Sequence, residues 1–150
     1  MDIILWINKM NPKQIFVEGL ALPNEPLSNI QLISAAKKLK IKNFKGVFVR
    51  DQLPEKQSRN AECGILNLDS SLGRGTHWTA WYKSGSEKLY FDSYGLRPPN
   101  ELVEYLQSPP LYNSERVQPE GQVFCGHLCL YVLKKLSDGC KFQEVVNTLY

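Results

Sequence analysis

The sequence predicts an α+β fold in which a mixed central β-sheet is clasped by helices. Strand-like runs occupy the middle of the chain, and segments with helical periodicity lie on both sides of them. The chain has 150 residues, which is the size of one domain, and its 43% apolar and 22% charged residues are typical of a globular protein. We therefore expect residues 1–150 to form a single domain.

The N-terminal segment, residues 1–27, is expected to be irregular, because Pro12, Pro23 and Pro26 interrupt any long element. A helix over residues 28–40 follows, with its first serine as the cap and apolar residues at helical spacing.

Five lysines lie at and after the end of this helix: Lys37, Lys38, Lys40, Lys42 and Lys45. They either form a solvated helix end, where cations suit the helix dipole, or a patch that contacts phosphate groups. The net charge of +3 is too small to indicate a dedicated nucleic-acid binder, so any nucleic-acid contact through these lysines is expected to be weak.

Strands are expected at residues 46–50, 63–68, 78–83 and 88–92, with a hairpin turn at residues 84–87 between the last two. Three more helices are expected, at residues 98–107, over the apolar run 125–136, and from residue 142 to the C-terminus.

The predicted hairpin brings a histidine close to a carboxylate. If Lys83 lies opposite Lys88, Asp92 faces Thr79, and His77 lies two residues away on the same side of the sheet. A hydrogen bond between Asp92 and His77 would fix the imidazole tautomer and stabilise its protonated form. The alternative is an ordinary surface ion pair.

Cys125 is expected at the start of a buried helix, because Pro119 and Gly121 disfavour a helix before it. Free N–H groups and the positive end of the helix dipole favour a thiolate at such a position. Gly126 would let a substrate backbone approach closely. The alternative is a cysteine that simply packs in the core.

The remaining cysteines are expected to be core residues: Cys63, Cys129 and Cys140. A zinc site would need two of the cysteines around His127 together with Cys63 and His77, but the spacing is not that of a zinc knuckle. We therefore expect neither a metal ion nor another cofactor.

The informative residues follow a fixed order along the chain: His77, Trp78, Asp92, Gln118 and, seven positions later, Cys125 followed by Gly126. This order resembles the adenovirus-type (adenain-like) cysteine proteases of adenoviruses, Maverick/Polinton elements, adintoviruses and virophages. Those enzymes share a clan with the ubiquitin-like-protein-specific proteases. The resemblance covers roughly residues 40–140 and includes the blocks 43–50 and 64–69.

The resemblance implies a role for each matched position. Cys125 is implied as the nucleophile, His77 as the base and then the acid, and Asp92 as the residue that orients His77. Gln118 is implied as an oxyanion-hole donor, together with the Cys125 backbone N–H. Trp78 is implied as a wall of the substrate groove, although core packing explains an aromatic residue there equally well.

The sequence departs from the adenoviral enzymes at three points. Asp92 stands where those enzymes often carry Glu, which orients an imidazole equally well. No cysteine lies between Cys63 and Cys125, where their disulfide-linked peptide cofactor attaches, so we expect no such covalent activation. The chain also ends 25 residues after Cys125, so we expect a compact core.

The function expected from the resemblance is a cysteine endopeptidase that cleaves virion or capsid precursor proteins, after small or glycine-containing sites. Two alternatives stay open: an isopeptidase acting on ubiquitin or ubiquitin-like proteins, and a non-catalytic module that binds nucleic acid or capsid. We expect no secretory signal, because the N-terminal residues include no basic segment and no long apolar run, and no run in the sequence reaches the about 18 apolar residues of a membrane span. We expect a monomer without membrane contact, located in the host cytoplasm or nucleus or packaged in the virion.

Overall fold

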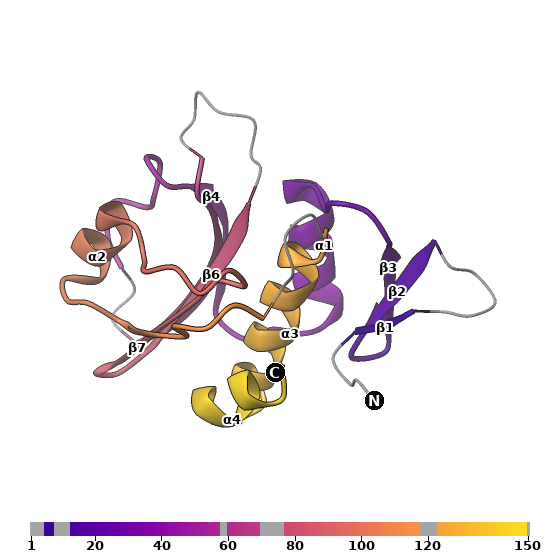
Figure 1. The fold of residues 1–150 in the computed structure, drawn as a ribbon. Helices are drawn as coiled ribbons and strands as arrows, with labels where there is room; N and C mark the ends of the chain where they lie inside the picture. Colours follow the sequence, from indigo (N-terminus) through magenta and orange to yellow (C-terminus); the bar gives the residue numbers. More distant parts are fainter. Residues whose placement is uncertain (1–4, 8–12, 58–59, 70–76, 118–122, 150) are drawn as a thin grey trace.

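A five-stranded mixed sheet forms the centre of the protein, in the order β4-β5-β6-β7-β8. The computed structural model describes residues 5–7, 13–57, 60–69, 77–117 and 123–149 (Figure 1). The strands of this sheet are β4 (Phe44–Val49), β5 (Ala61–Asn67), β6 (Trp78–Ser84), β7 (Glu87–Phe91) and β8 (Leu111–Tyr112). β6 pairs with β5 and with β7 in antiparallel orientation. The edge strands are parallel to their neighbours, β4 to β5 and β8 to β7.

The hairpin of β6 and β7 has the predicted register. Lys83 pairs with Lys88, and the ladder continues to Ser84 and Glu87, so the turn itself is only Gly85 and the residue after it. Gly85 has a φ of +60°, which a tight two-residue hairpin turn requires. This register therefore brings His77 and Asp92 to the same end of the hairpin, as the sequence predicts.

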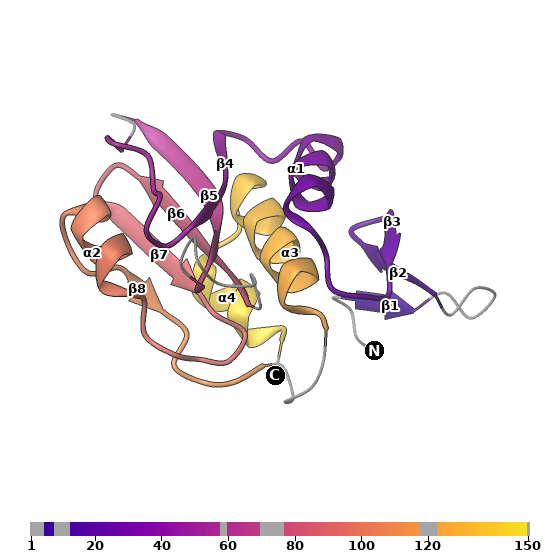
Figure 2. The same ribbon diagram turned by 90° about the horizontal axis from the view of Figure 1, so that it is seen from above.

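Helices cover both faces of the central sheet (Figures 1 and 2). Helix α3 (Cys125–Ser137) lies against β6, with α1 (Asn29–Lys38) and α4 (Phe142–Asn147) beside it. Helix α2 (Asn100–Leu106) lies on the opposite face. The predicted α+β architecture, with Cys125 at the N-terminus of a buried helix, is confirmed.

Each face of the sheet has its own apolar core. Between the sheet and α3 the packed side chains include Ile65, Phe91 and Leu130, whereas Trp81 and Leu102 belong to the core under α2. Burying this much apolar surface on both faces holds the strands in a fixed register. The ends of β6 and β7 are thus fixed from both sides.

The prediction that residues 1–27 are irregular is wrong. Within the described residues, β1 (Leu5–Ile7), β2 (Gln14–Val17) and β3 (Leu20–Pro23) form an antiparallel three-stranded sheet. The turn between β2 and β3 consists of Glu18 and Gly19, both with positive φ (47° and 84°). An Asn-Gly pair would have signalled this turn, and β3 ends at its proline, where a strand edge tolerates the missing N–H.

The helix predicted at residues 28–40 is confirmed, and its cap explains where it begins. The Ser28 hydroxyl accepts a hydrogen bond from the Gln31 backbone N–H at 3.1 Å, and the Gln31 side chain accepts one from the Ser28 N–H at 2.8 Å. This reciprocal pair satisfies two N–H groups that the first turn would otherwise leave free.

Candidate active site

His77 and Asp92 meet at one end of the β6–β7 hairpin. His77 directly precedes β6 and Asp92 directly follows β7, and the His77 Nε2 lies 2.6 Å from the Asp92 Oδ1. The Asp92 side chain is fully buried, and only 11% of the His77 side chain is exposed. The predicted pair is therefore a shielded hydrogen bond, not a surface ion pair.

Asp92 is held in place by several backbone and side-chain contacts. The side chain of Asn113 accepts a hydrogen bond from the Asp92 N–H at 3.0 Å and donates one to the Asp92 carbonyl at 2.6 Å. The Tyr94 backbone N–H donates to the Asp92 Oδ1 at 2.8 Å. Two donors thus converge on the same carboxylate oxygen, Tyr94 N–H and the His77 ring, which fixes its orientation.

A second segment, residues 113–117, lies along the loop that carries Asp92. The Val117 N–H donates to the Ser93 carbonyl at 2.8 Å. Gly95 has a φ of +72°, and a Cβ at this position would lie 2.7 Å from the Glu115 carbonyl carbon. Only glycine combines this backbone conformation with such a close approach, so Gly95 lets the two segments pack together.

Cys125 is the first residue of α3, and its side chain meets the histidine. Phe124, the N-cap residue, makes no side-chain hydrogen bond to the first turn, and Cys125 lies at the positive end of the helix dipole. The His77 ring makes a hydrogen bond to Asp92, and the Cys125 side chain lies close enough to His77 to affect its protonation. Because Nε2 is engaged by Asp92, the other ring nitrogen, Nδ1, is the one left for Cys125.

The contacts of His77 favour its protonated form. Burial by itself lowers the pKa of His77, but the hydrogen bond to Asp92 and the interaction with Cys125, together with the charges of these two groups, outweigh burial and raise the pKa to about 9. An imidazolium beside a thiol is the arrangement that supports a thiolate–imidazolium pair. Such an arrangement would support nucleophilic chemistry at Cys125.

The other two buried cysteines are unsuited to this chemistry. Burial raises the pKa of Cys63 to about 12 and that of Cys129 well above its usual value, so both thiols stay protonated. Both are core residues, as predicted. Cys140 is exposed, so the prediction that it is a core residue is wrong. It follows Gly139, where the chain turns at the end of α3, and the apolar run has already ended there.

His127 does not take part in the site. Its ring is fully buried, and its Nε2–H donates to the Pro23 carbonyl at 2.8 Å, which connects α3 to β3. Burial lowers the pKa of His127 and outweighs its hydrogen bond to the Pro23 carbonyl. A neutral, enclosed ring of this kind is a structural residue.

The contacts of Trp78 and Gly126 are packing contacts. Trp78 is buried, and its indole N–H donates to the Leu27 carbonyl at 2.9 Å. A Cβ at Gly126 would lie 3.3 Å from the Trp78 ring and 3.2 Å from Leu32. Gly126 therefore lets α3 approach Trp78 and α1 closely. A part for either residue in substrate binding stays a prediction.

Gln118, implied as the oxyanion donor, lies outside the described residues, so its position relative to Cys125 stays a prediction. The five lysines predicted as a basic patch (Lys37, Lys38, Lys40, Lys42 and Lys45) are all exposed. Among the described residues, no three histidine, cysteine or acidic side chains are grouped so as to hold a metal ion. Within the same part of the chain, every helix is too short or too polar to cross a membrane.

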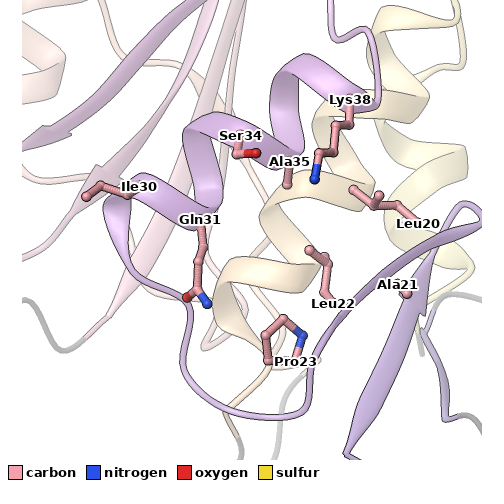
Figure 3. Close-up of a pocket in the computed structure, with 9 residues that line it drawn as sticks. All are labelled: Leu20, Ala21, Leu22, Pro23, Ile30, Gln31, Ser34, Ala35 and Lys38. Atoms are coloured by element: carbon pink, nitrogen blue, oxygen red, sulfur yellow. The ribbon is translucent and has the colours of Figure 1, made fainter.

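A groove of about 300 Å³ lies between β3 and α1 (Figure 3). Leu20 and Pro23 form its strand side, and Ile30 and Lys38 lie on the helix side. None of the residues that meet at His77 lines it. The groove is therefore separate from the candidate catalytic centre.

Comparisons with known proteins show the fold. No family model matches the sequence, and no curated protein matches it. Among solved structures, the chain is similar to the crystal structure of the ASFV pS273R protease, with a TM-score of 0.59 and 16% sequence identity over 83% of this chain. The match covers 63% of that protein's length. The chain thus has the fold of a protease, and the narrower adenovirus-type assignment stays a prediction.

Proposed function

We propose that this protein is a cysteine peptidase that uses Cys125 as nucleophile, His77 as general base and acid, and Asp92 as the group that orients His77. The observation that carries the proposal is the buried hydrogen bond between Asp92 and His77, with Cys125 close to the same histidine at the start of α3. Three residues from different parts of the sequence meet in the order that thiol catalysis requires. The similarity to a protease fold supports the same conclusion.

The reaction follows from these positions. The Cys125 thiolate attacks the carbonyl carbon of the scissile bond, and the carbonyl oxygen gains a negative charge. His77 then donates its proton to the leaving amine as the carbon–nitrogen bond breaks, which leaves an acyl-enzyme. A water molecule, deprotonated by His77, attacks the thioester, and the acid product and free thiol are released.

The order of the residues supports Gln118 as a donor to the oxyanion, with the Cys125 backbone N–H as the second donor. Removal of one such donor costs about 10²–10³-fold in rate in other enzymes. We expect Gln118→Ala to lower kcat by about this factor without a comparable change in KM. A Gln118→Ala enzyme with unchanged kcat would remove Gln118 from the mechanism.

We propose protein substrates, namely virion or capsid structural precursors cut after small or glycine-containing sites; this substrate class rests on the sequence resemblance. The test is covalent capture of Cys125 by two electrophilic probes, detected by intact mass. One probe is a short peptide that ends in a glycine vinyl sulfone, and the other is ubiquitin with the same C-terminal group. Faster capture of the peptide supports the endopeptidase, and faster capture of ubiquitin supports the isopeptidase.

The exposed lysines support a separate, weaker proposal of contact with nucleic acid. Exposed lysines attract phosphate groups mainly through screened electrostatics, so binding should weaken steeply with salt. Fluorescence anisotropy with a labelled DNA duplex at about 50 and 200 mM salt tests this. Substitution of Lys37, Lys38 and Lys40 by glutamine should reduce the binding at low salt. Equal binding by the substituted protein would contradict the proposal.

A further inference from the structure

Tyr94 packs on the face of the candidate catalytic histidine. The rings of Tyr94 and His77 are stacked, with centroids 4.2 Å apart and an angle of 3° between their planes. The Arg116 guanidinium carbon lies 4.8 Å from the centre of the Tyr94 ring. The Tyr94 ring therefore contacts both the His77 imidazole and the Arg116 guanidinium.

We propose that Tyr94 is a positioning residue, which holds the His77 ring in the plane that connects Asp92 with Cys125. This inference rests on the proposed function. Tyr94 acts through His77, and the contacts that define it involve no substrate atom.

The geometry explains why such a contact is needed. A hydrogen bond from Nε2 to one carboxylate oxygen fixes one point of the imidazole, but the ring can still tilt about this point and move its Nδ1 away from the thiol. A parallel ring at 4.2 Å blocks this tilt on one side. Small displacements of reacting groups have large effects on rate, because the reacting atoms must lie within a narrow range of positions.

Tyr94 is well placed for this role because it is itself fixed at two points. Its backbone N–H donates to the Asp92 Oδ1 at 2.8 Å, the same oxygen that accepts from His77. Its ring is covered by Arg116. One residue therefore ties the carboxylate through its backbone and the imidazole through its side chain, so that the two groups cannot move independently.

The stack also affects the charge on His77. The face of a phenol ring carries partial negative charge and attracts a cation placed over it. Among the described residues, Asp92, Cys125 and Tyr94 lie against His77, and Arg116 lies over the Tyr94 ring. Arg116 has the same sign as an imidazolium, but it is exposed, so solvent and salt screen its repulsion. The net effect of Tyr94 is to favour protonated His77.

The test compares aromatic and non-aromatic residues at position 94. Tyr94→Phe keeps the stacked ring, whereas Tyr94→Leu and Tyr94→Gln remove it and place an apolar or a polar side chain at this half-buried site. Tyr112→Leu is the matched control, because Tyr112 is 41% exposed on β8. Two quantities are measured: kcat/KM on a fluorogenic peptide with glycine before the scissile bond, and the pKa of His77 by NMR titration. The chain has only two histidines, so the signals are assigned with a His127→Gln variant.

We expect Tyr94→Leu and Tyr94→Gln to lower kcat/KM by about 10–100-fold and the pKa of His77 by about 0.5 units. Tyr94→Phe and Tyr112→Leu should stay within about threefold of the unchanged enzyme, since neither loses the stack. Folded non-aromatic variants with unchanged kcat/KM and unchanged His77 pKa would overturn the inference. Loss of the folded state in both would also overturn it, because Tyr94 would then be a structural residue.

The NMR measurement separates this inference from the proposed function, because it needs no substrate. If the unchanged protein cleaves no peptide but Tyr94→Leu shifts the His77 titration as expected, the proposed function fails and the positioning role of Tyr94 stands.

Discussion

The side chain of Asn113 makes two hydrogen bonds to the backbone of Asp92. The Asn113 Oδ1 accepts one from the Asp92 N–H at 3.0 Å, and the Asn113 Nδ2 donates one to the Asp92 carbonyl at 2.6 Å. The Asn113 amide thus extends the backbone hydrogen bonding of the sheet by one residue beyond β7, at Asp92, whose carboxylate contacts His77. Asn113 is 5% exposed, so water cannot easily replace these bonds.

Asn113→Ala should therefore reduce activity more than stability alone explains. It removes the partner of the buried Asp92 N–H, which costs about 1–3 kcal/mol of unfolding free energy, while the Asp92 carbonyl keeps the hydrogen bond from the Gly95 N–H. Misplacement of the Asp92 carboxylate should lower kcat/KM by about tenfold or more in the remaining folded protein. Urea unfolding and peptide hydrolysis measure the two effects. Asn100→Ala, at an exposed asparagine on α2, is the control and should change neither by much.

Asp92→Asn tests the orientation of the histidine. An asparagine keeps the shape of the side chain but removes its charge, so both the tautomer and the protonated form of His77 lose support. The same substitution costs about 10⁴-fold in kcat in a serine protease triad. We expect a loss of about 10²–10⁴-fold here, with KM little changed, measured by steady-state hydrolysis. A loss of less than about threefold would show that Asp92 has no part in catalysis.

The pH dependence should have a basic limb near pH 9. His77 must be protonated to support a Cys125 thiolate and to donate its proton to the leaving group, and its pKa is raised to about 9. Peptidase activity should therefore fall as pH rises through about 9. Stability should follow the same sign, because a raised pKa in the folded state stabilises the protein below pH 6.5, and this contribution is lost between about 6.5 and 9. His77→Gln should abolish this part of the pH dependence of unfolding.

Gly95→Ala and Gly85→Ala form a matched pair. Both glycines have positive φ, +72° and +60°, so an alanine strains the backbone at either site by about 1 kcal/mol. A Cβ at Gly85 has nothing within 4 Å, whereas one at Gly95 would lie 2.7 Å from the Glu115 backbone. We expect Gly95→Ala to cost at least about 2 kcal/mol more in thermal or urea unfolding, since residues 113–117 must move away. Equal losses of unfolding free energy in the two variants would show that the close approach at Gly95 does not affect stability.

Much of the fold could be predicted from the sequence, since the strands of the hairpin and the long helices follow regular hydrophobic patterns. The short turn sets the register of the hairpin. This register determines which residues lie on the same side of the sheet, and that is sufficient to pair His77 with Asp92. The N-terminal sheet could not be predicted, because its strands are only 3–4 residues long and its turn uses Glu18 and Gly19. Asn113 and Tyr94 escape prediction for a different reason. Their roles depend on tertiary contacts, and an asparagine or tyrosine in a polar loop has no pattern of its own.

The central claim is that Cys125 is the nucleophile, and the most direct measurement is hydrolysis of a glycine-containing fluorogenic peptide by variants that each lack one cysteine. Cys125→Ala removes the thiol that contacts His77, and Cys140→Ala removes the exposed thiol as a matched control. We predict that Cys125→Ala abolishes hydrolysis, with a loss of at least about 10³-fold, while Cys140→Ala retains full activity. Hydrolysis by a folded Cys125→Ala protein at the rate of the unchanged enzyme would contradict the account.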